Sequence, residues 1–460
     1  AFADQRLTVD IARHALAAAD PDLALNNLER LTATVDTSDL AVVLVDQTST
    51  VQLLTILGAS PFLTGILCRR AGFFAGLFRK GQINQAKTEQ QMSDELRQLI
   101  DDAADTAQMK KGLRTYKAEE MLRIGSRDLC GMAELEEVTA ELSALAAASL
   151  QRAFEICSVQ LQKEYGAPLL DTEEGEANRE AEFTILGMGK FGGCELNFSS
   201  DIDLIYFYSS DRGQTSGIDD PARGRHNRIS LHQYFVKLSE MITRAIGQAT
   251  EDGFVFRVDL RLRPEGNSGE MANSLAAAEI YYESWGQSWE RSAMLKARPV
   301  AGSKLLGEEL LERLDPFIYR RHLDYAMIDD IKVMKQKIDH SLSREKEGGQ
   351  NLKLGKGGIR EIEFIVQSLQ LVRGGARREL RERHRRDLAP VPPEGHIDAG
   401  LDARVAAALA EPTGRGLGQR IARGVLVDQP VAVVVQRVTE LRFSTGKWIA
   451  GVIGDRKSVV

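Results

Sequence analysis

The sequence is poor in cysteine and in aromatic residues, and it contains no long apolar run. Only four of its 460 residues are cysteines, and no two of them form a C-x-x-C pair, which excludes a disulfide framework and a zinc site of that spacing. No apolar run approaches the ~18–20 residues that cross a bilayer, and no basic segment followed by an apolar one opens the chain. These absences predict a cytoplasmic protein with reduced thiols, no secretory signal and no membrane partner.

An excess of positive charge is also missing. The formal net charge is −7, whereas sequence-independent nucleic-acid binding needs a basic face, so we expect no nucleic-acid partner. Apolar residues make up 43 % of the chain and charged residues 27 %, which is the balance of a globular protein rather than a disordered one. A chain of this length suggests two to four domains.

The periodicity of the apolar residues divides the chain into four segments. Up to residue 165 they recur every three or four positions, as in helices. Short alternating or continuous apolar runs then indicate strands, before the helical period returns. We therefore expect an N-terminal helical region at 1–165, a strand-containing core at 166–272, a helical domain at 273–375 and an atypical tail at 376–460.

Three strands and one helix are expected in the core segment. The strands are predicted at 183–188, 201–208 and 256–263, with a helix at 231–246 and a polar loop at 212–228. From residue 276 onward the pattern is helical, with a clear amphipathic helix at 328–342.

The tail differs abruptly in composition from the rest of the chain. Between Arg373 and Arg386 seven of fourteen residues are arginine, and five of the twelve prolines lie beyond Ala389. A sudden gain of arginine, proline and valine is what a frameshift would produce. We expect residues from about 376 to be poorly ordered or to be an out-of-frame extension.

A paired-carboxylate motif gives the strongest functional signal. Seven residues separate Gly192-Gly193 from Asp201-Ile202-Asp203. On a strand, Asp201 and Asp203 point to the same face while Ile202 points into the core. Two carboxylates at this spacing can hold one or two Mg²⁺ ions, which prefer oxygen ligands and would stabilise charge on a reacting phosphoryl group.

Residues beside this pair are suited to phosphate. Gly192 and Gly193 lack side chains, so backbone N–H groups can approach phosphate oxygens closely. Lys190 adds positive charge near the same turn. Ser200 can hydrogen-bond phosphate or simply start the strand.

The third expected strand supplies a further carboxylate. Its odd positions, which share one face, are Arg257, Asp259, Arg261 and Arg263. Asp259 would join Asp201 and Asp203 as a third metal ligand, and the arginines Arg261 and Arg263 would meet phosphate charge. Mutually repelling carboxylates are most readily explained by a bound cation.

Each of these features alone has a simpler explanation. A single D-x-D is usually a solvated strand edge, a Gly-Gly pair a turn, and an alternating arginine strand an exposed sheet face. Their combination in one order is far more specific and predicts a metal-dependent nucleotidyltransferase. Another nucleotidyltransferase with a different acceptor and a non-catalytic binding module remain as alternatives.

The residues also match a known family. Residues 187–205, read as GMGKFGGCELNFSSDIDLI, closely resemble the nucleotidyltransferase motif of the bacterial glutamine synthetase adenylyltransferases, also called adenylyl-removing enzymes. Further similar stretches are VDLRLRPEG at 258–266, the tryptophan-containing segment 281–298 and GKGGIREIEF at 355–364. The resemblance covers about residues 40–375.

The resemblance implies an α+β fold, with a polymerase-β-type nucleotidyltransferase domain (a small mixed sheet with helices) embedded between largely helical segments. It assigns Asp201, Asp203 and Asp259 to catalysis and Mg²⁺, and Gly192 and Gly193 to the phosphate-cradling turn. It also implies that Arg360, Glu361 and Glu363 contact nucleotide or a second domain. An equal alternative is that these three residues form a buried salt-bridge network.

The same resemblance implies a reaction and its partners. Such proteins carry two nucleotidyltransferase domains, of which the N-terminal one removes AMP from a tyrosine of glutamine synthetase by phosphorolysis, giving ADP, and the other attaches AMP from ATP. The order of motifs here resembles the removing half, so the attaching half would be absent from this chain. The expected partners are adenylylated glutamine synthetase, a PII-type signalling protein, ADP or ATP, and phosphate.

Overall fold

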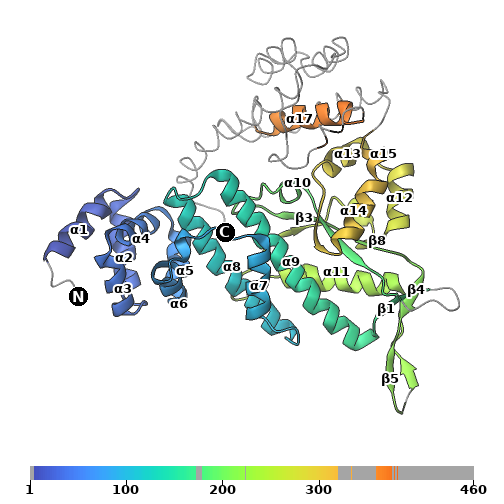
Figure 1. Cartoon of the computed structure of the whole chain (residues 1–460), viewed down its shortest axis with the longest axis horizontal. Helices are drawn as coiled ribbons and strands as arrows, with labels where there is room; N and C mark the ends of the chain where they lie inside the picture. Colours follow the sequence, from blue (N-terminus) through green and yellow to red (C-terminus); the bar gives the residue numbers. More distant parts are fainter. Residues whose placement is uncertain are drawn as a thin grey trace, which may run out of the picture.

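The computed structural model describes residues 5–171, 179–222, 224–319 and 359–375, together with the single positions 333, 378 and 381. Helices make up the first part of the chain, a small sheet follows, and further helices cover the sheet (Figure 1). This arrangement confirms the predicted α+β class, with a small mixed sheet set between helical segments. The amphipathic helix expected at 328–342 and the tail at 376–460 lie outside the described residues, apart from the isolated positions 333, 378 and 381.

The N-terminal helices begin at residues that satisfy free backbone N–H groups. Asp20, Asp46 and Ser60 accept such N–H groups at three helix starts, and Thr88 and Asp105 form capping boxes at two others. The helices are α1 (Gln5–Leu16), α2 (Pro21–Thr32), α3 (Thr37–Val45), α4 (Gln47–Ala59), α5 (Pro61–Arg69), α6 (Gly72–Phe74), α7 (Glu89–Leu99), α8 (Thr106–Leu129) and α9 (Leu135–Tyr165), with short helical turns at Ala75–Arg79 and Gln82–Asn84.

No single helix among the described residues has the length and apolar character needed to cross a membrane. Helices α3 and α4 reach that length and composition only when taken together, and they are bent by 112° at the break between them.

The central sheet contains five strands in mixed orientation. They are β2 (Phe183–Gly187), β3 (Ile202–Tyr208), β7 (Val258–Asp259), β8 (Ala272–Ser274) and β9 (Arg298–Gly302). The main order is β7-β3-β2-β9, with β2 antiparallel to both β3 and β9, whereas β7 and β8 run parallel to β3. Strand β3 therefore lies in the middle of the sheet, and its first residues adjoin β7.

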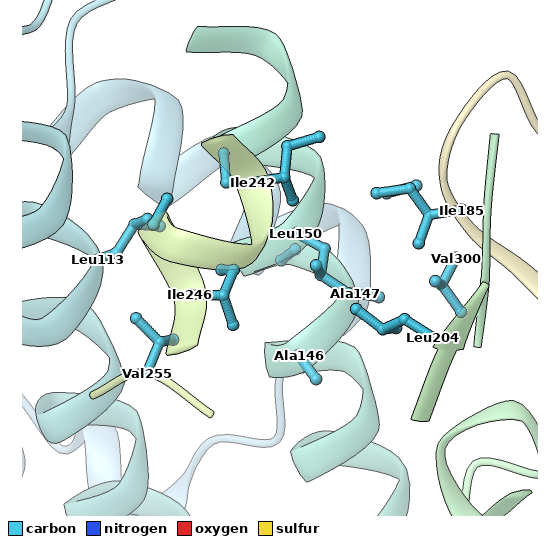
Figure 2. Close-up of a cluster of buried hydrophobic side chains, with 14 of the residues drawn as sticks. Leu113, Ala146, Ala147, Leu150, Ile185, Leu204, Ile242, Ile246, Val255 and Val300 are labelled. Carbon is cyan, nitrogen blue, oxygen red and sulfur yellow. The ribbon is translucent and has the colours of Figure 1, made fainter. Parts of the chain in front are cut away.

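Two apolar cores cover the two faces of the sheet. Side chains from α9 and α11 (Leu231–Gly247) pack in one core with Ile185 and Leu204 of the sheet, and Leu113 of α8 joins this core on the far side of α11 (Figure 2). The alternate residues Leu186 and Ile205 face a second core. Its helices are α12 (Leu275–Ser284), α13 (Ser288–Met294), α14 (Lys304–Arg313), α15 (Asp315–Ile318) and α17 (Ile359–Arg373). The helices before and after the core segment thus pack directly on its sheet.

Several strand predictions need correction. The strand expected at 256–263 ends at Asp259, because the Asp259 carboxylate accepts the backbone N–H of Arg261 at 2.9 Å and turns the chain. The loop expected at 212–228 contains β4 (Gly213–Thr215), which pairs with β1 (Pro168–Leu170), and the hairpin β5 (Ile218–Asp220) with β6 (Gly224–His226). The segment from 276 onward is not purely helical, since it contributes β9 to the sheet.

Arg114 joins the N-terminal helices to the core. Its buried guanidinium, on α8, donates to the carbonyl oxygens of Gly253 at 2.8 Å and Ala245 at 3.2 Å, and also to that of Gln248. The carbonyls of Ala245 and Gln248 lie at the end of α11, where helical donors run out. That of Gly253 lies in the following turn and also accepts the backbone N–H of Thr250 at 2.9 Å.

We expect Arg114→Met to lower the free energy of unfolding by about 2–4 kcal/mol, because the hydrogen bonds from the buried guanidinium to three carbonyl oxygens of the core segment would be lost. Urea unfolding measures this loss. Lys111→Met, on the exposed side of the same helix, is the control and should change stability by less than about 0.5 kcal/mol. Equal stability of the two variants would show that Arg114 does not join the two parts.

Candidate functional site

The site is built where β3 begins. Strands β3 and β7 are parallel and in register, so that Asp203 lies opposite Asp259. Ile202 and Leu204 on either side of Asp203 are fully buried, which confirms that they point into the core. Because alternate residues of a strand face opposite ways, Asp203 points away from that core. The sheet therefore brings together two of the three predicted carboxylates.

The environment of Asp203 disfavours its negative charge. Burial, followed by repulsion from Asp259 and Asp201, raises the pKa of Asp203 to about 6. In contrast, hydrogen bonds from Arg261 hold the pKa of Asp259 below its ordinary value. A carboxylate that is buried beside two others gains most from a bound cation.

Two arginines form ion pairs with the carboxylates of Asp201 and Asp259. Arg257 forms an ion pair with Asp201 and donates to the carbonyl oxygen of Ser199 at 2.7 Å, and Arg261 forms an ion pair with Asp259. In the described part of the chain, no three His, Cys, Asp or Glu side chains are placed closely enough to hold a metal ion. The predicted three-carboxylate cluster is thus not assembled in this conformation, since Asp201 is turned to Arg257.

The glycine turn next to Asp203 is tightly packed. Instead of a simple turn, Gly189–Gly192 forms the short helix α10, which follows β2. A Cβ atom on Gly192 would lie 2.0 Å from the carbonyl oxygen of Lys296, whereas one on Gly193 would meet nothing nearer than 3.3 Å. Gly189, at φ +54°, leaves room beside Oδ2 of Asp203, where a Cβ would lie at 3.0 Å.

The other residues predicted to bind phosphate include Lys190, Ser200 and Arg263, and each has a different environment. Lys190 lies partly buried within α10. The Ser200 hydroxyl accepts the backbone N–H of Asn197 at 3.3 Å and so closes the turn before β3. Arg263 donates to the carbonyl oxygens of Leu260, Asn267 and Gly269 at 2.8–3.2 Å, which favours a role in shaping the loop over contact with phosphate.

The donor set fits a hard cation such as Mg²⁺. Asp201, Asp203 and Asp259 offer only oxygen atoms, and Gly189 leaves the side of Asp203 open. Asp203 is the carboxylate that burial makes most dependent on a positive partner. For all three carboxylates to face one ion, Arg257 and Arg261 must release Asp201 and Asp259.

The sequence pattern did not predict that two further residues lie near the turn. Lys296 and Arg298 touch Gly192 only because β9 pairs with β2, more than 100 residues earlier in the chain. Lys296 also forms an ion pair with Glu363 at 3.1 Å, which favours the salt-bridge alternative for that glutamate. The side chains of Arg360 and Glu361 lie outside the described part.

Two family models match parts of the chain. Residues 50–313 match the family model for glutamate-ammonia ligase adenylyltransferase, and residues 332–442 match that for PII-uridylyltransferase. The second match runs across residue 376. The out-of-frame extension expected from there on stays a prediction.

Curated relatives are similar over the same region. The chain is 41 % identical over 333 residues to a bifunctional glutamine synthetase adenylyltransferase/adenylyl-removing enzyme of Shewanella loihica, which covers 72 % of this chain and 33 % of the relative. A protein of the same name from Pseudomonas aeruginosa is 40 % identical over 328 residues, a match that covers 71 % of this chain and 32 % of the relative. One from Nitrosococcus oceani is 38 % identical over 358 residues, and that match covers 78 % of this chain and 36 % of the relative.

The matched region includes the whole site. Residues 50–313 hold the glycine turn, the three carboxylates and the strands that carry them. The chain spans about a third of the length of the curated relatives it matches. It belongs to the glutamate-ammonia ligase adenylyltransferase family.

Proposed function

We propose that this chain is a Mg²⁺-dependent nucleotidyltransferase that removes AMP from an adenylylated tyrosine of glutamine synthetase by phosphorolysis, giving ADP. The observation that carries the proposal is the facing pair Asp203 and Asp259 beside the glycine turn. The names of the relatives include adenylyl removal, and the site here follows a long helical segment as expected of the removing half.

The bond changes in this reaction balance without an oxidant or a further co-reactant. An oxygen of hydrogen phosphate attacks the phosphorus of the tyrosine-linked AMP, the bond from phosphorus to the tyrosine oxygen breaks, and the tyrosine oxygen takes the proton that hydrogen phosphate gives up. The new P–O–P bond makes ADP. Because phosphate is already an anionic nucleophile, no dedicated general base is needed, and positioning and electrostatics supply most of the rate.

The residues of the site have distinct tasks in this proposal. Bound to Asp201, Asp203 and Asp259, Mg²⁺ would supply positive charge to the transferred group and the departing oxygen. The glycine turn gives phosphate oxygens close access to the backbone. Arg257 and Arg261, once they leave the carboxylates, are free to meet phosphate charge.

The partners follow from the same proposal. Adenylylated glutamine synthetase would be the substrate, phosphate and ADP would be the small-molecule partners, and a PII-type signalling protein would be the regulator. ATP would be the nucleotide of the attaching half.

Phosphorolysis by the purified chain tests the proposal. We would mix it with adenylylated glutamine synthetase, Mg²⁺ and phosphate and follow ADP, with Asp201→Asn and Asp259→Asn as active-site variants and with phosphate omitted in a parallel sample. ADP that needs both phosphate and the carboxylates supports the proposal. No ADP from the folded protein would point to another acceptor or to a disabled regulatory fragment.

A further inference from the structure

Lys296 lies between the glycine turn and helix α17. Its ammonium group contacts Glu195 at 2.9 Å and Glu363 at 3.1 Å. Glu195 is two residues beyond Gly193, and Glu363 is on the second turn of α17. One side chain therefore joins the end of the turn to a helix that is more than 160 residues away in the sequence.

The ion pairs of Lys296 differ from ordinary surface pairs. The side chains of Lys296, Glu195 and Glu363 are only 17 %, 31 % and 24 % exposed. Partial burial weakens screening by water and salt, so the three charges constrain one another more strongly than exposed pairs do. Losing the central cation would leave two partly buried carboxylates without this partner.

The backbone of Lys296 contacts the turn as well. Its carbonyl oxygen fills the space where a Cβ of Gly192 would lie, and Arg298 donates to the carbonyl oxygen of Gly192 at 3.2 Å. The turn itself is held by short-range bonds, from the N–H of Gly193 to Gly189 at 3.1 Å and from that of Glu195 to Lys190 at 2.7 Å. Main chain and side chain of this segment thus support the turn from the same direction.

Helix α17 is anchored to the second apolar core. Phe364, Leu371 and Val372 belong to the second apolar core, and α17 packs against α13 (Figure 1). A shift of α17 on that core would move Glu363 relative to Lys296 and, through Lys296, act on Glu195.

We propose that Lys296 is a positioning residue through which α17 holds the Gly189–Gly193 turn in the shape that receives a phosphate group, so that the placement of α17 sets the affinity for nucleotide. The coupling itself is independent of the proposed function, whereas its consequence for nucleotide rests on that function. In this proposal Lys296 acts through the turn, by way of Glu195 and Gly192.

Hydrogen exchange in the ligand-free protein tests the coupling. We expect Lys296→Met to speed amide exchange in residues 189–196 about tenfold, and Glu363→Gln to speed it by a smaller factor, with exchange in α8 and α9 unchanged. Lys296→Arg, which keeps the cation, should restore the slow exchange. Arg313→Met is the matched control, because Arg313 also bridges two glutamates, Glu279 and Glu309, but away from the turn.

Binding of ADP, measured by calorimetry with and without Mg²⁺, tests the consequence. Lys296→Met should weaken ADP binding about tenfold, Lys296→Arg should bind within about twofold of the parent, and Glu363→Gln added to Lys296→Met should cause no further loss. If Lys296→Met fails to fold, Glu363→Gln and Glu195→Gln carry both measurements.

Unchanged exchange at 189–196 in folded Lys296→Met and Glu363→Gln would overturn the inference. So would ADP binding that is equal in parent, Lys296→Met and Glu363→Gln. A parent protein that binds no ADP would instead count against the proposed function, and the exchange experiment would still decide the coupling.

Discussion

Asp203→Asn is expected to abolish activity while making the metal-free protein more stable. Activity should fall about 10³-fold, because the central carboxylate of the proposed metal site loses its charge. Stability should rise because the raised pKa of Asp203 means that its charge is disfavoured in the folded state. Since the side chain is still partly open to solvent, we expect a gain of about 1–2 kcal/mol in the free energy of unfolding at pH 7.5 in EDTA.

The pH dependence of this gain gives a second check. The folded-state pKa of Asp203 is about 6, above its ordinary value of 3.8, so the folded state binds more protons between these values. The gain in unfolding free energy from Asp203→Asn should therefore be complete above about pH 6 and disappear as the pH falls below 3.8. Urea unfolding at several pH values measures it. A variant less stable than the parent at pH 7.5 would contradict the conclusion that the folded state disfavours the negative charge of Asp203.

Gly192→Ala is expected to damage both the fold and the site. The added Cβ would lie 2.0 Å from the carbonyl oxygen of Lys296 and 2.4 Å from that of Gly187, and both are backbone atoms. Neither can move away without shifting β2 or β9. We expect the free energy of unfolding to fall by about 2–4 kcal/mol and ADP formation by about a hundredfold, as the turn is displaced.

Gly193→Ala is the stability control for that substitution. Its Cβ would meet the flexible Cδ of Lys296 at 3.3 Å, and its φ of −80° suits any L-residue. The two variants add the same methyl group to neighbouring positions, so a change of less than about 1 kcal/mol at Gly193 isolates the steric effect at Gly192. Equal losses in unfolding free energy at both positions would contradict the packing described for the turn.

Local pattern was enough to predict two strands of the central sheet. The apolar runs at 183–187 and 202–208 are buried on both faces, so composition alone distinguishes them from helices. The third strand was predicted too long. Polar and apolar residues alternate in the sequence to residue 263, but the Asp259 side chain turns the backbone before that. Strand β9 was missed, since its pairing with β2 depends on tertiary contacts and its sequence includes a proline.

The site was predictable where it depends on spacing along one strand. The D-x-D motif places Asp203 correctly outside the core, and the parallel pairing with β7 brings Asp259 opposite to it. The arginine pairs with Asp201 and Asp259 were not predicted, because alternation placed Arg257 and Arg261 as neighbours of the carboxylates and not as their partners. The position of Lys296 beside the turn could not be predicted from the sequence, because it depends on the pairing of β9 with β2.

The fate of labelled inorganic phosphate tests the central claim most directly. With adenylylated glutamine synthetase, Mg²⁺ and ³²P-labelled phosphate, the account predicts label in the β-phosphate of ADP with the parent protein and about 10³-fold less with Asp203→Asn. Release of unlabelled AMP would mean hydrolysis in place of phosphorolysis. Label in ADP that persists with Asp203→Asn would contradict the assignment of the site.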